Sequence, residues 1–138
     1  MNPPDSVIRE LLVTSKTIAV VGLSSNPERS SNGVAGRLQA AGYRIIPVNP
    51  NEKEVWGERA YADLASVPVA IDIVDVFRRP EYTPPIAADA VKLGARALWL
   101  QQGVVNEEAE RIARAGGLIV VMDACLAVMV SRMRVRVG

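Results

Sequence analysis

The chain has 138 residues, of which 49% are hydrophobic and 22% are charged, so it can bury one core but is too short for two domains. Its net charge of +1 and its aromatic content of 4% argue against a nucleic-acid surface, which needs a positive field and stacking side chains. It contains a single cysteine, Cys125, and no histidine, which excludes internal disulfides, Cys/His zinc sites and histidine-dependent catalytic triads or dyads.

The sequence also argues against a membrane protein. It contains no run of about 20 apolar residues that could span a bilayer. The first residues, MNPPDSVIRELL, lack both the basic start and the apolar core of a signal peptide. These features predict a cytoplasmic protein that contacts neither membranes nor nucleic acids.

The first part of the chain predicts a helix, a strand and a second helix. A short helix begins at Asp5 or Ser6, either of which can cap it. The apolar run at 17–22 predicts a strand that is covered on both faces. After a polar loop, Ser31 or Asn32 caps the second helix.

Four more strands are predicted from apolar runs, and they alternate mostly with helices. Their ranges are 43–48, 71–76, 96–100 and 118–122. We expect one helix from about Pro84 to Leu93 and another that is opened by Asn106. The connection between the second and third strands is the exception, with at most one short helix near 61–66. This alternation predicts an α/β fold: a single Rossmann-like domain over 1–138, with an open parallel sheet of about five strands and helices on both faces.

The C-terminal segment, 124–138, has an unusual pattern. The stretch ACLAVMV at 124–130 is apolar on every side of a helix, so it must be buried or must face a partner. Beyond it, apolar and arginine residues alternate over 133–137, a pattern that fits an edge strand or a basic tail. We interpret the segment as a contact between copies of the chain in a homo-oligomer, with an ordinary buried last helix as the alternative.

The polar loop after the first strand lies where ligands bind in such a sheet, beyond the carboxyl ends of the strands. The loop follows Gly22, but the next glycine is Gly33, so the closely spaced glycines of a dinucleotide fingerprint are missing. The second strand ends in Val48-Asn49-Pro50, which places no carboxylate there to bind ribose hydroxyls. Both observations disfavour a standard NAD site, and no Walker motif is present.

The same loop carries groups that suit a phosphate. Four serines offer hydroxyls, Arg29 offers a cation, and the helix that follows presents the positive end of its dipole. The four serines are Ser24, Ser25, Ser30 and Ser31. Serine and asparagine are also common turn formers and caps, so a purely structural role for these residues is the alternative.

Several motifs, taken in order, carry a family resemblance. They are V-N-P at 48–50, V-D-V-F-R at 74–78, W-L-Q-Q-G-V at 99–104 and N-E-E-A at 106–109. With them, the chain from about Thr17 to Cys125 resembles the stand-alone bacterial and archaeal CoA-binding domain proteins, which are related to the N-terminal domain of succinyl-CoA synthetase alpha chains. The resemblance implies that the chain binds coenzyme A or an acyl-CoA through its diphosphate and adenosine.

The resemblance also implies which residues bind the ligand. The loop after Gly22 and the helix start would hold the diphosphate, the V-N-P motif would border the adenosine, Phe77 and Arg78 would contact the adenine and phosphate region, and the turn at 101–103 would face the pantetheine arm. The implied site is Gly22, Ser24, Ser25, Arg29, Ser30, Ser31, Asn32, Val48, Asn49, Pro50, Phe77, Arg78, Gln101 and Gly103. We expect the neighbouring Arg79 and Lys53 to be solvated loop residues.

The C-terminus departs from the family pattern. Members continue as D-R-C-x-x-x-E-H, whereas here Ala124, Met129 and Val130 stand where the Arg, Glu and His would be, and only Asp123 and Cys125 match. Because no histidine can activate its thiol, Cys125 is expected to be a small buried hydrophobic residue; a mixed disulfide with the CoA thiol is the alternative.

Catalysis is not expected. No acid–base pair is visible near the loops, and the ATP-grasping domain and phosphorylatable histidine of an acyl-CoA ligase are missing. No metal site is expected either. We therefore predict a non-catalytic CoA-binding domain, with an oligomeric scaffold whose nucleotide site is vestigial, or an NAD(P)-binding protein, as the alternatives.

Overall fold

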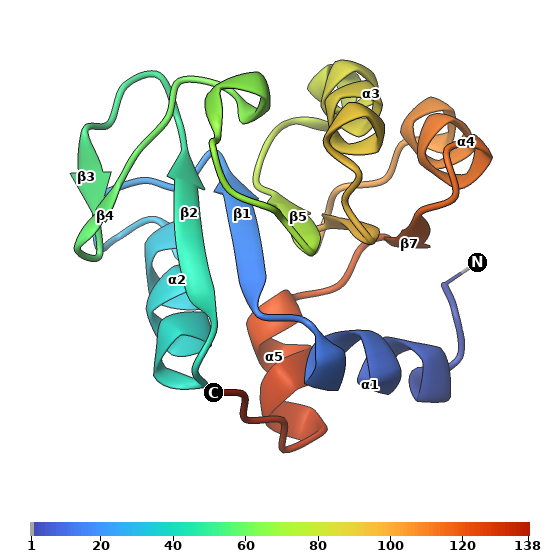
Figure 1. Ribbon diagram of the computed structural model, residues 1–138, viewed down its shortest axis with the longest axis horizontal. Helices are drawn as coiled ribbons and strands as arrows, with labels where there is room; N and C mark the ends of the chain where they lie inside the picture. The colour runs from blue at the N-terminus through green and yellow to red at the C-terminus, as the bar shows by residue number, and fades with distance from the viewer. Residues whose placement is uncertain (1) are drawn as a thin grey trace.

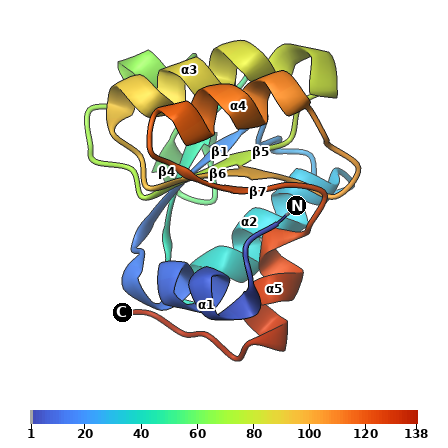
Figure 2. The ribbon, with the colours of Figure 1, turned by 90° about the vertical axis from the view of Figure 1, so that its right-hand side faces the viewer.

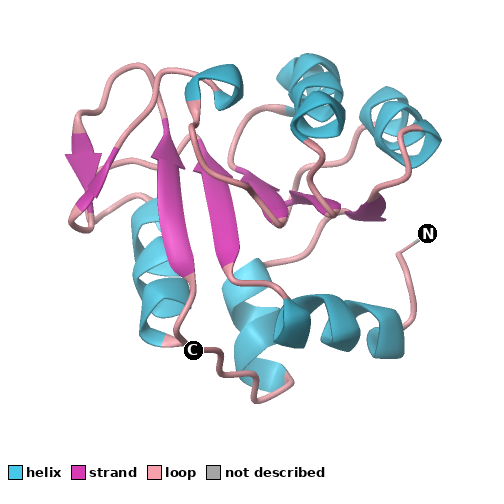
Figure 3. Ribbon diagram, viewed as in Figure 1, coloured by secondary structure: helices cyan, strands magenta, loops and turns pink. Residues whose placement is uncertain are grey.

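A computed structural model of the chain describes residues 2–138. Its centre is a parallel sheet of five strands in the order β2-β1-β5-β6-β7 (Figures 1 and 3). The strands are β1 Thr17–Val21, β2 Arg44–Val48, β5 Ile73–Val76, β6 Ala97–Leu100 and β7 Ile119–Val121. The chain moves outward from β1 to β2 and then returns to the other side of β1 at β5, so the winding reverses between β1 and β5. The predicted Rossmann-like sheet is confirmed.

Helices cover both faces of this sheet, as Figure 2 shows. One face packs against α1 Asp5–Thr14, α2 Ser30–Ala40 and α5 Leu126–Arg132, and the other against α3 Thr83–Leu93 and α4 Glu107–Ala115. Asn106 caps α4 as predicted, because its Oδ1 accepts a hydrogen bond from Ala109 N at 2.8 Å. No helix within residues 2–138 has the length and apolar character needed to cross a bilayer.

Two predicted helix starts are wrong. The residue before α1 is Pro4, not Asp5 or Ser6, and no side chain caps that helix. The α2 helix begins one residue before Ser31, and again no side chain caps it. The polar residues expected as α2 caps bond to the preceding loop instead: Ser31 Oγ accepts from Ser24 N at 3.1 Å, and Asn32 Nδ2 donates to Ser24 O at 3.0 Å.

The connection from β2 to β5 contains a hairpin that was not predicted. Its two short strands are β3 Glu54–Val55 and β4 Glu58–Arg59, and only a single 3₁₀ turn, η1 Leu64–Ser66, follows. Trp56 and Gly57 form the turn with φ of 54° and 78°, the left-handed values that a two-residue hairpin loop requires. Trp56 also donates from Nε1 to Asn32 O at 2.9 Å, so the hairpin is fastened to α2.

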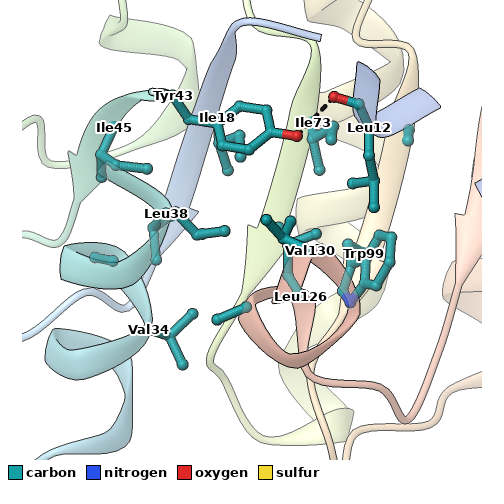
Figure 4. Packing of buried hydrophobic residues seen from close by; sticks show 14 of the residues in the cluster. Leu12, Ile18, Val34, Leu38, Tyr43, Ile45, Ile73, Trp99, Leu126 and Val130 are labelled. Atoms are coloured by element: carbon teal, nitrogen blue, oxygen red, sulfur yellow. Dashed lines mark hydrogen bonds between the residues drawn. The ribbon is translucent and has the colours of Figure 1, made fainter. Parts of the chain in front are cut away.

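The core contains the large ring of Trp99 and a carboxyl group, that of Asp75. Trp99 is fully buried among the residues of Figure 4 and donates from Nε1 to Ala124 O at 2.9 Å. Asp75 lies between Val20 and Trp99 in the sheet register, is fully buried, and has two carboxyl oxygens with no hydrogen-bond partner among residues 2–138. Burial raises the pKa of Asp75 well above its ordinary value, because the apolar surroundings disfavour the charged form.

The C-terminal segment packs against its own chain. Leu126, Ala127 and Val130 of α5 are buried, whereas Val128 is 51% exposed. Residues 133–138 do not form an edge strand; they run along the end of α2, where Val137 N donates to Ala41 O at 2.8 Å. Burial in the core thus accounts for most of the apolar run, and a contact between copies stays a prediction.

Candidate functional site

A cleft of about 770 Å³ opens at the carboxyl ends of the central strands, beside the point where the winding reverses. Nine of the predicted site residues line it: Gly22, Ser24, Arg29, Ser30, Ser31, Asn49, Phe77, Arg78 and Gln101. Five do not, namely Ser25, Asn32, Val48, Pro50 and Gly103. Gln102, which belongs to the turn assigned to the pantetheine arm, lines the cleft too. The remaining lining residues were not assigned to the site: Val34, Asn51, Glu52, Arg79, Pro80, Val104 and Cys125.

Gly22 forms the floor of the cleft where β1 and β5 end side by side. Its N–H donates to Val48 O at 2.8 Å, and Phe77 N donates to Val21 O at 2.8 Å, so both chain segments are fixed. Gly22 has a φ of 90°, and a Cβ at this position would overlap the carbonyl oxygen of Phe77. Only glycine lets the chain turn here with the β5 backbone so close.

The loop between Gly22 and α2 is held by its own side chains. Ser24 lies at the centre: its N–H donates to Ser31 Oγ, and its Oγ accepts from Asn26 N at 3.0 Å. The side chain of Asn32, which lies outside the cleft lining, donates to the carbonyl oxygen of Ser24 and so also holds the loop in place. The loop thus has a fixed shape that places Ser24 and the first turn of α2 at the cleft.

The turn after β2 forms a second wall, and Asn49 shapes it. This side chain is 8% exposed, donates from Nδ2 to Leu23 O at 3.1 Å and accepts at Oδ1 from Asn51 N at 3.0 Å. The turn brings Glu52 back to the loop, where Glu52 Oε2 accepts from Ser25 N at 2.8 Å and from Ser25 Oγ at 3.0 Å. A carboxylate therefore does stand beside the end of β2. Residues 48–50 lack such a group, and it is the turn that follows them that supplies it.

Three guanidinium groups line the cleft, from Arg29, Arg78 and Arg79. None of them forms an ion pair with an acidic side chain of residues 2–138. Arg79 is exposed on the loop just after β5, as expected for a solvated loop residue, and it also contributes to the cleft lining. Unpaired arginines around a fixed loop suit an anion, and above all a phosphate, which guanidinium groups bind in a forked geometry.

The far end of the cleft lies at β6 and the start of α5. Gln101 is 5% exposed, and its Oε1 accepts from Leu126 N at 3.0 Å, which leaves Nε2 without a partner among the described residues. Gly103 N donates to Asp123 Oδ1 at 2.7 Å and lies outside the cleft lining, where Gln102 takes its place. Cys125 is half-buried and lines the cleft, so it is less enclosed than expected.

The residues present fit an elongated, phosphorylated ligand such as coenzyme A. Three guanidinium groups and a fixed loop line the cleft, together with the amide groups of Gln101 and Gln102 and the thiol of Cys125. Within residues 2–138, no group of three or more His, Cys, Asp or Glu side chains is arranged to hold a metal ion.

Comparison with known proteins extends these observations. The family described as CoA binding domain matches residues 16–131. The protein YneT of Bacillus subtilis is 46% identical over 127 residues, which cover 92% of this chain and 94% of YneT. The solved structure of a hypothetical protein from Pyrococcus horikoshii OT3 matches with a TM-score of 0.93 and 38% identity, over 96% of this chain and 93% of that one.

A more distant relative is much longer. The alpha subunit of acetate–CoA ligase (ADP-forming) II from Pyrococcus furiosus is 24% identical over 123 residues, which cover 81% of this chain but only 27% of the subunit. This chain therefore corresponds to a small part of that protein. Since the family pattern covers most of its length and YneT matches it almost from end to end, the chain belongs to the CoA binding domain family.

Proposed function

We propose that this chain binds coenzyme A or an acyl-CoA in the cleft and does not itself catalyse a reaction. The observation that carries the proposal is the set of three unpaired guanidinium groups, from Arg29, Arg78 and Arg79, around a rigid loop in a chain of the CoA binding domain family. An unpaired arginine in a cleft contributes little to folding, but it gains charge-assisted hydrogen bonds when a phosphate arrives.

Each part of the ligand has matching groups in the cleft. The loop at Ser24, the first turn of α2 and Arg29 would hold the diphosphate, because backbone amides, hydroxyls and a cation converge there. Arg78 and the turn after β2 would border the adenosine. Gln101, with a free Nε2, would donate to a carbonyl of the pantetheine arm.

The groups that line the cleft support the proposal of binding without catalysis. Glu52 is its one carboxylate among the described lining residues, and that group already accepts two hydrogen bonds from Ser25. The Cys125 thiol is the other group of the described lining that could accept a proton, and no hydrogen bond joins it to Glu52. The ligase activity in the name of the Pyrococcus furiosus relative belongs to a protein of which this chain matches 27%.

The test is calorimetric titration of ligand-free protein with CoA and, in parallel, with NAD. We expect CoA to bind and NAD to bind much more weakly. Arg29→Ala and Arg78→Ala should each weaken CoA binding by about 1–3 kcal/mol, the range for a lost charged hydrogen bond. Arg111→Ala, on the exposed side of α4, is the matched control and should leave the affinity unchanged.

Two results would contradict the proposal. If the Arg29 and Arg78 variants bound CoA as tightly as the wild type, the cleft would not be the binding site. If neither CoA nor NAD bound, a scaffold with a vestigial nucleotide site would be the better description, and the chain's assembly state would then be the property to measure.

A further inference from the structure

A second cavity, of about 420 Å³, lies along α5 and beside the last turn of α2. None of its lining residues belongs to the cleft. Apart from Ser131, the lining consists of apolar and cationic side chains. The apolar residues are Ala40, Ala41, Ala127, Val130 and Val135, and the cationic ones are Arg37, Arg134 and Arg136. The cavity is therefore separate from the cleft, partly apolar and positively charged.

The arginines of this cavity have no partner in the chain. The guanidinium groups of Arg37, Arg134 and Arg136 form no hydrogen bond or ion pair with residues 2–138. Arg132 lies in the same segment but outside the cavity lining, and it pairs with Asp5 at 3.4 Å. Of the three arginines at 132–136, the two that line the cavity are thus the two that remain available to a ligand.

The segment that carries Arg134 and Arg136 has a fixed backbone. Figure 1 shows that it leads from α5 to the end of α2. Val135 is 4% exposed, and its N–H donates to Val130 O at 3.0 Å. Val137 N donates to Ala41 O at 2.8 Å, which fastens the segment to α2 on the far side of Arg136. Both guanidinium groups therefore extend from an ordered segment and not from a free tail.

Arg134 occupies a backbone position that favours glycine. It follows Met133, the C-cap of α5, and has a φ of 54° in the left-handed region. Helices often carry glycine at this place, because a Cβ is unfavourable at such a φ. Arginine thus lowers the stability of the helix end relative to glycine, and its contribution lies in its charge.

The charge of the cavity exceeds what the helix ends can balance. Both α2 and α5 end beside it, and a helix C-terminus acts as about half a negative charge. Two such ends offset about one of the three guanidinium groups, so about two positive charges remain. A two-fold contact between copies of the chain is disfavoured here, because it would bring the same arginines face to face.

We propose that this cavity is a second ligand site, which binds a small organic phosphate. A phosphate monoester carries close to two negative charges at neutral pH, and guanidinium groups bind it through paired hydrogen bonds. The volume is in the range of small-molecule sites and exceeds what a bare phosphate would fill. The rest of the ligand would contact the alanine and valine side chains. This site does not depend on the CoA-binding function proposed for the cleft.

The experiment follows backbone amide chemical shifts by NMR while the protein is titrated with phenyl phosphate, at about pH 8, where the phosphate is doubly charged. Inorganic phosphate and benzyl alcohol serve as probes that lack the apolar part and the charge, respectively. We expect phenyl phosphate to shift the amides of Ala41, Val130 and Val135, inorganic phosphate to bind more weakly, and benzyl alcohol not to bind.

Three variants test the arginines. Arg134→Gly and Arg136→Ala should each weaken the binding of phenyl phosphate by about tenfold, as expected for a lost charged hydrogen bond. Arg132→Ala is the matched control, because it changes the net charge equally from the same segment but lies outside the lining. Thermal unfolding should show no loss of stability in Arg134→Gly, since glycine suits the left-handed φ.

Three results would overturn the proposal. If only cleft amides such as those of Gly22 and Ser24 shifted, the anion would bind in the cleft alone. If Arg132→Ala weakened binding as much as Arg134→Gly, the effect would be one of net charge and not of a site. If Arg134→Gly changed the particle mass in sedimentation but not the affinity for phenyl phosphate, the cavity would be a contact between copies of the chain.

Discussion

Asp72 and Tyr43 at the amino end of the central sheet bond within the chain, whereas the cleft arginines at its carboxyl end form no ion pair with residues 2–138. At the amino ends of the strands, Asp72 Oδ2 accepts from Lys16 N at 2.8 Å and Thr17 N at 3.1 Å. Beside it, Tyr43 donates its hydroxyl to Leu12 O at 2.6 Å (Figure 4). At the carboxyl ends, the arginines of the cleft have no acidic partner among the described residues.

This difference separates groups that contribute to the stability of the fold, at the amino end, from groups that remain available to a ligand, at the carboxyl end. Groups that bond to one another inside the chain add to the free energy of unfolding, and they have nothing left for a ligand. Groups left without partners contribute little to folding but remain available. Changes at the amino end should therefore lower stability alone, and changes in the cleft should lower affinity more than stability.

The largest effect is expected at Gly22, where a substitution should lower both stability and affinity, because Gly22 fixes the backbone and also lines the cleft. Gly22→Ala should lower the free energy of unfolding by about 3 kcal/mol, since alanine is strained at positive φ and its Cβ would overlap Phe77 O. CoA binding should be lost as well. Denaturant unfolding and titration measure the two effects.

Gly33→Ala is the control for this change. Gly33 lies in α2, and apart from its chain neighbours and the nearby helix backbone no heavy atom lies within 4 Å of the place a Cβ would take. Gly33→Ala should therefore raise the free energy of unfolding by up to about 1 kcal/mol. If Gly22→Ala and Gly33→Ala changed the free energy of unfolding equally, the positive φ of Gly22 would not require a glycine.

Asp75, buried between the two ends of the sheet, should give the next largest effect. Its raised pKa means that the folded state keeps a proton that the unfolded state releases above pH of about 4. The contribution of Asp75 is therefore fully present below that pH and is lost as pH rises toward the folded pKa. Asp75→Asn cannot ionise, so its stability relative to the wild type should rise with pH, by up to about 1.4 kcal/mol per unit.

Denaturant unfolding of both proteins between pH 4.5 and 8, on about half-unit steps, measures this difference. A difference between wild type and Asp75→Asn that stayed constant over the range would show that Asp75 is charged in the folded protein.

Tyr43→Phe tests the amino end directly, with a smaller effect. It removes the donor to the buried carbonyl of Leu12 and should cost about 1–2 kcal/mol of stability. Affinity for CoA should not change, and a weakened affinity would contradict the division between the two ends. Burial raises the pKa of Tyr43 to about 12, so the wild type should also lose stability as pH rises from 10 toward 12, and Tyr43→Phe should not share this loss.

The smallest effect is expected at the surface. Arg44 and Glu58 form an ion pair at 3.6 Å, with side chains 52% and 27% exposed. Glu58→Gln should change the free energy of unfolding by about 0.5 kcal/mol or less, because water and salt screen such a pair. A larger change would mean that the hairpin is held by this contact and not mainly by Trp56.

The fold was predictable because its signals are local. The apolar runs marked each of the five strands, and Asn106 marked the start of α4 through bonds within one turn of helix. The start of α2 was misplaced because Ser31 and Asn32 bond to Ser24, a contact that no local pattern announces. The hairpin at 54–59 was missed because two-residue strands carry almost no pattern, although Gly57 marks its turn.

The site was predictable only in part, for a related reason. The loop after β1 and the residues after β5 were assigned to the ligand from their chemistry and from the family motifs. Glu52 and Arg79 were not, because their place in the cleft depends on how the turns after β2 and β5 fold back. Val48 and Pro50 flank Asn49 in the sequence. Only Asn49 lines the cleft, because the chain turns there.

The hydrogen bond between Gln101 and α5 restricts the rotamers of the Gln101 side chain before any ligand binds. A backbone N–H can only donate, so the amide oxygen of Gln101 must face Leu126, and the amide plane has one orientation left. A glutamine side chain otherwise loses about 1.5–2 kcal/mol of rotamer freedom when it is immobilised. Here that entropy is lost on folding, so Nε2 of Gln101 is already oriented for a ligand by the hydrogen bond to α5.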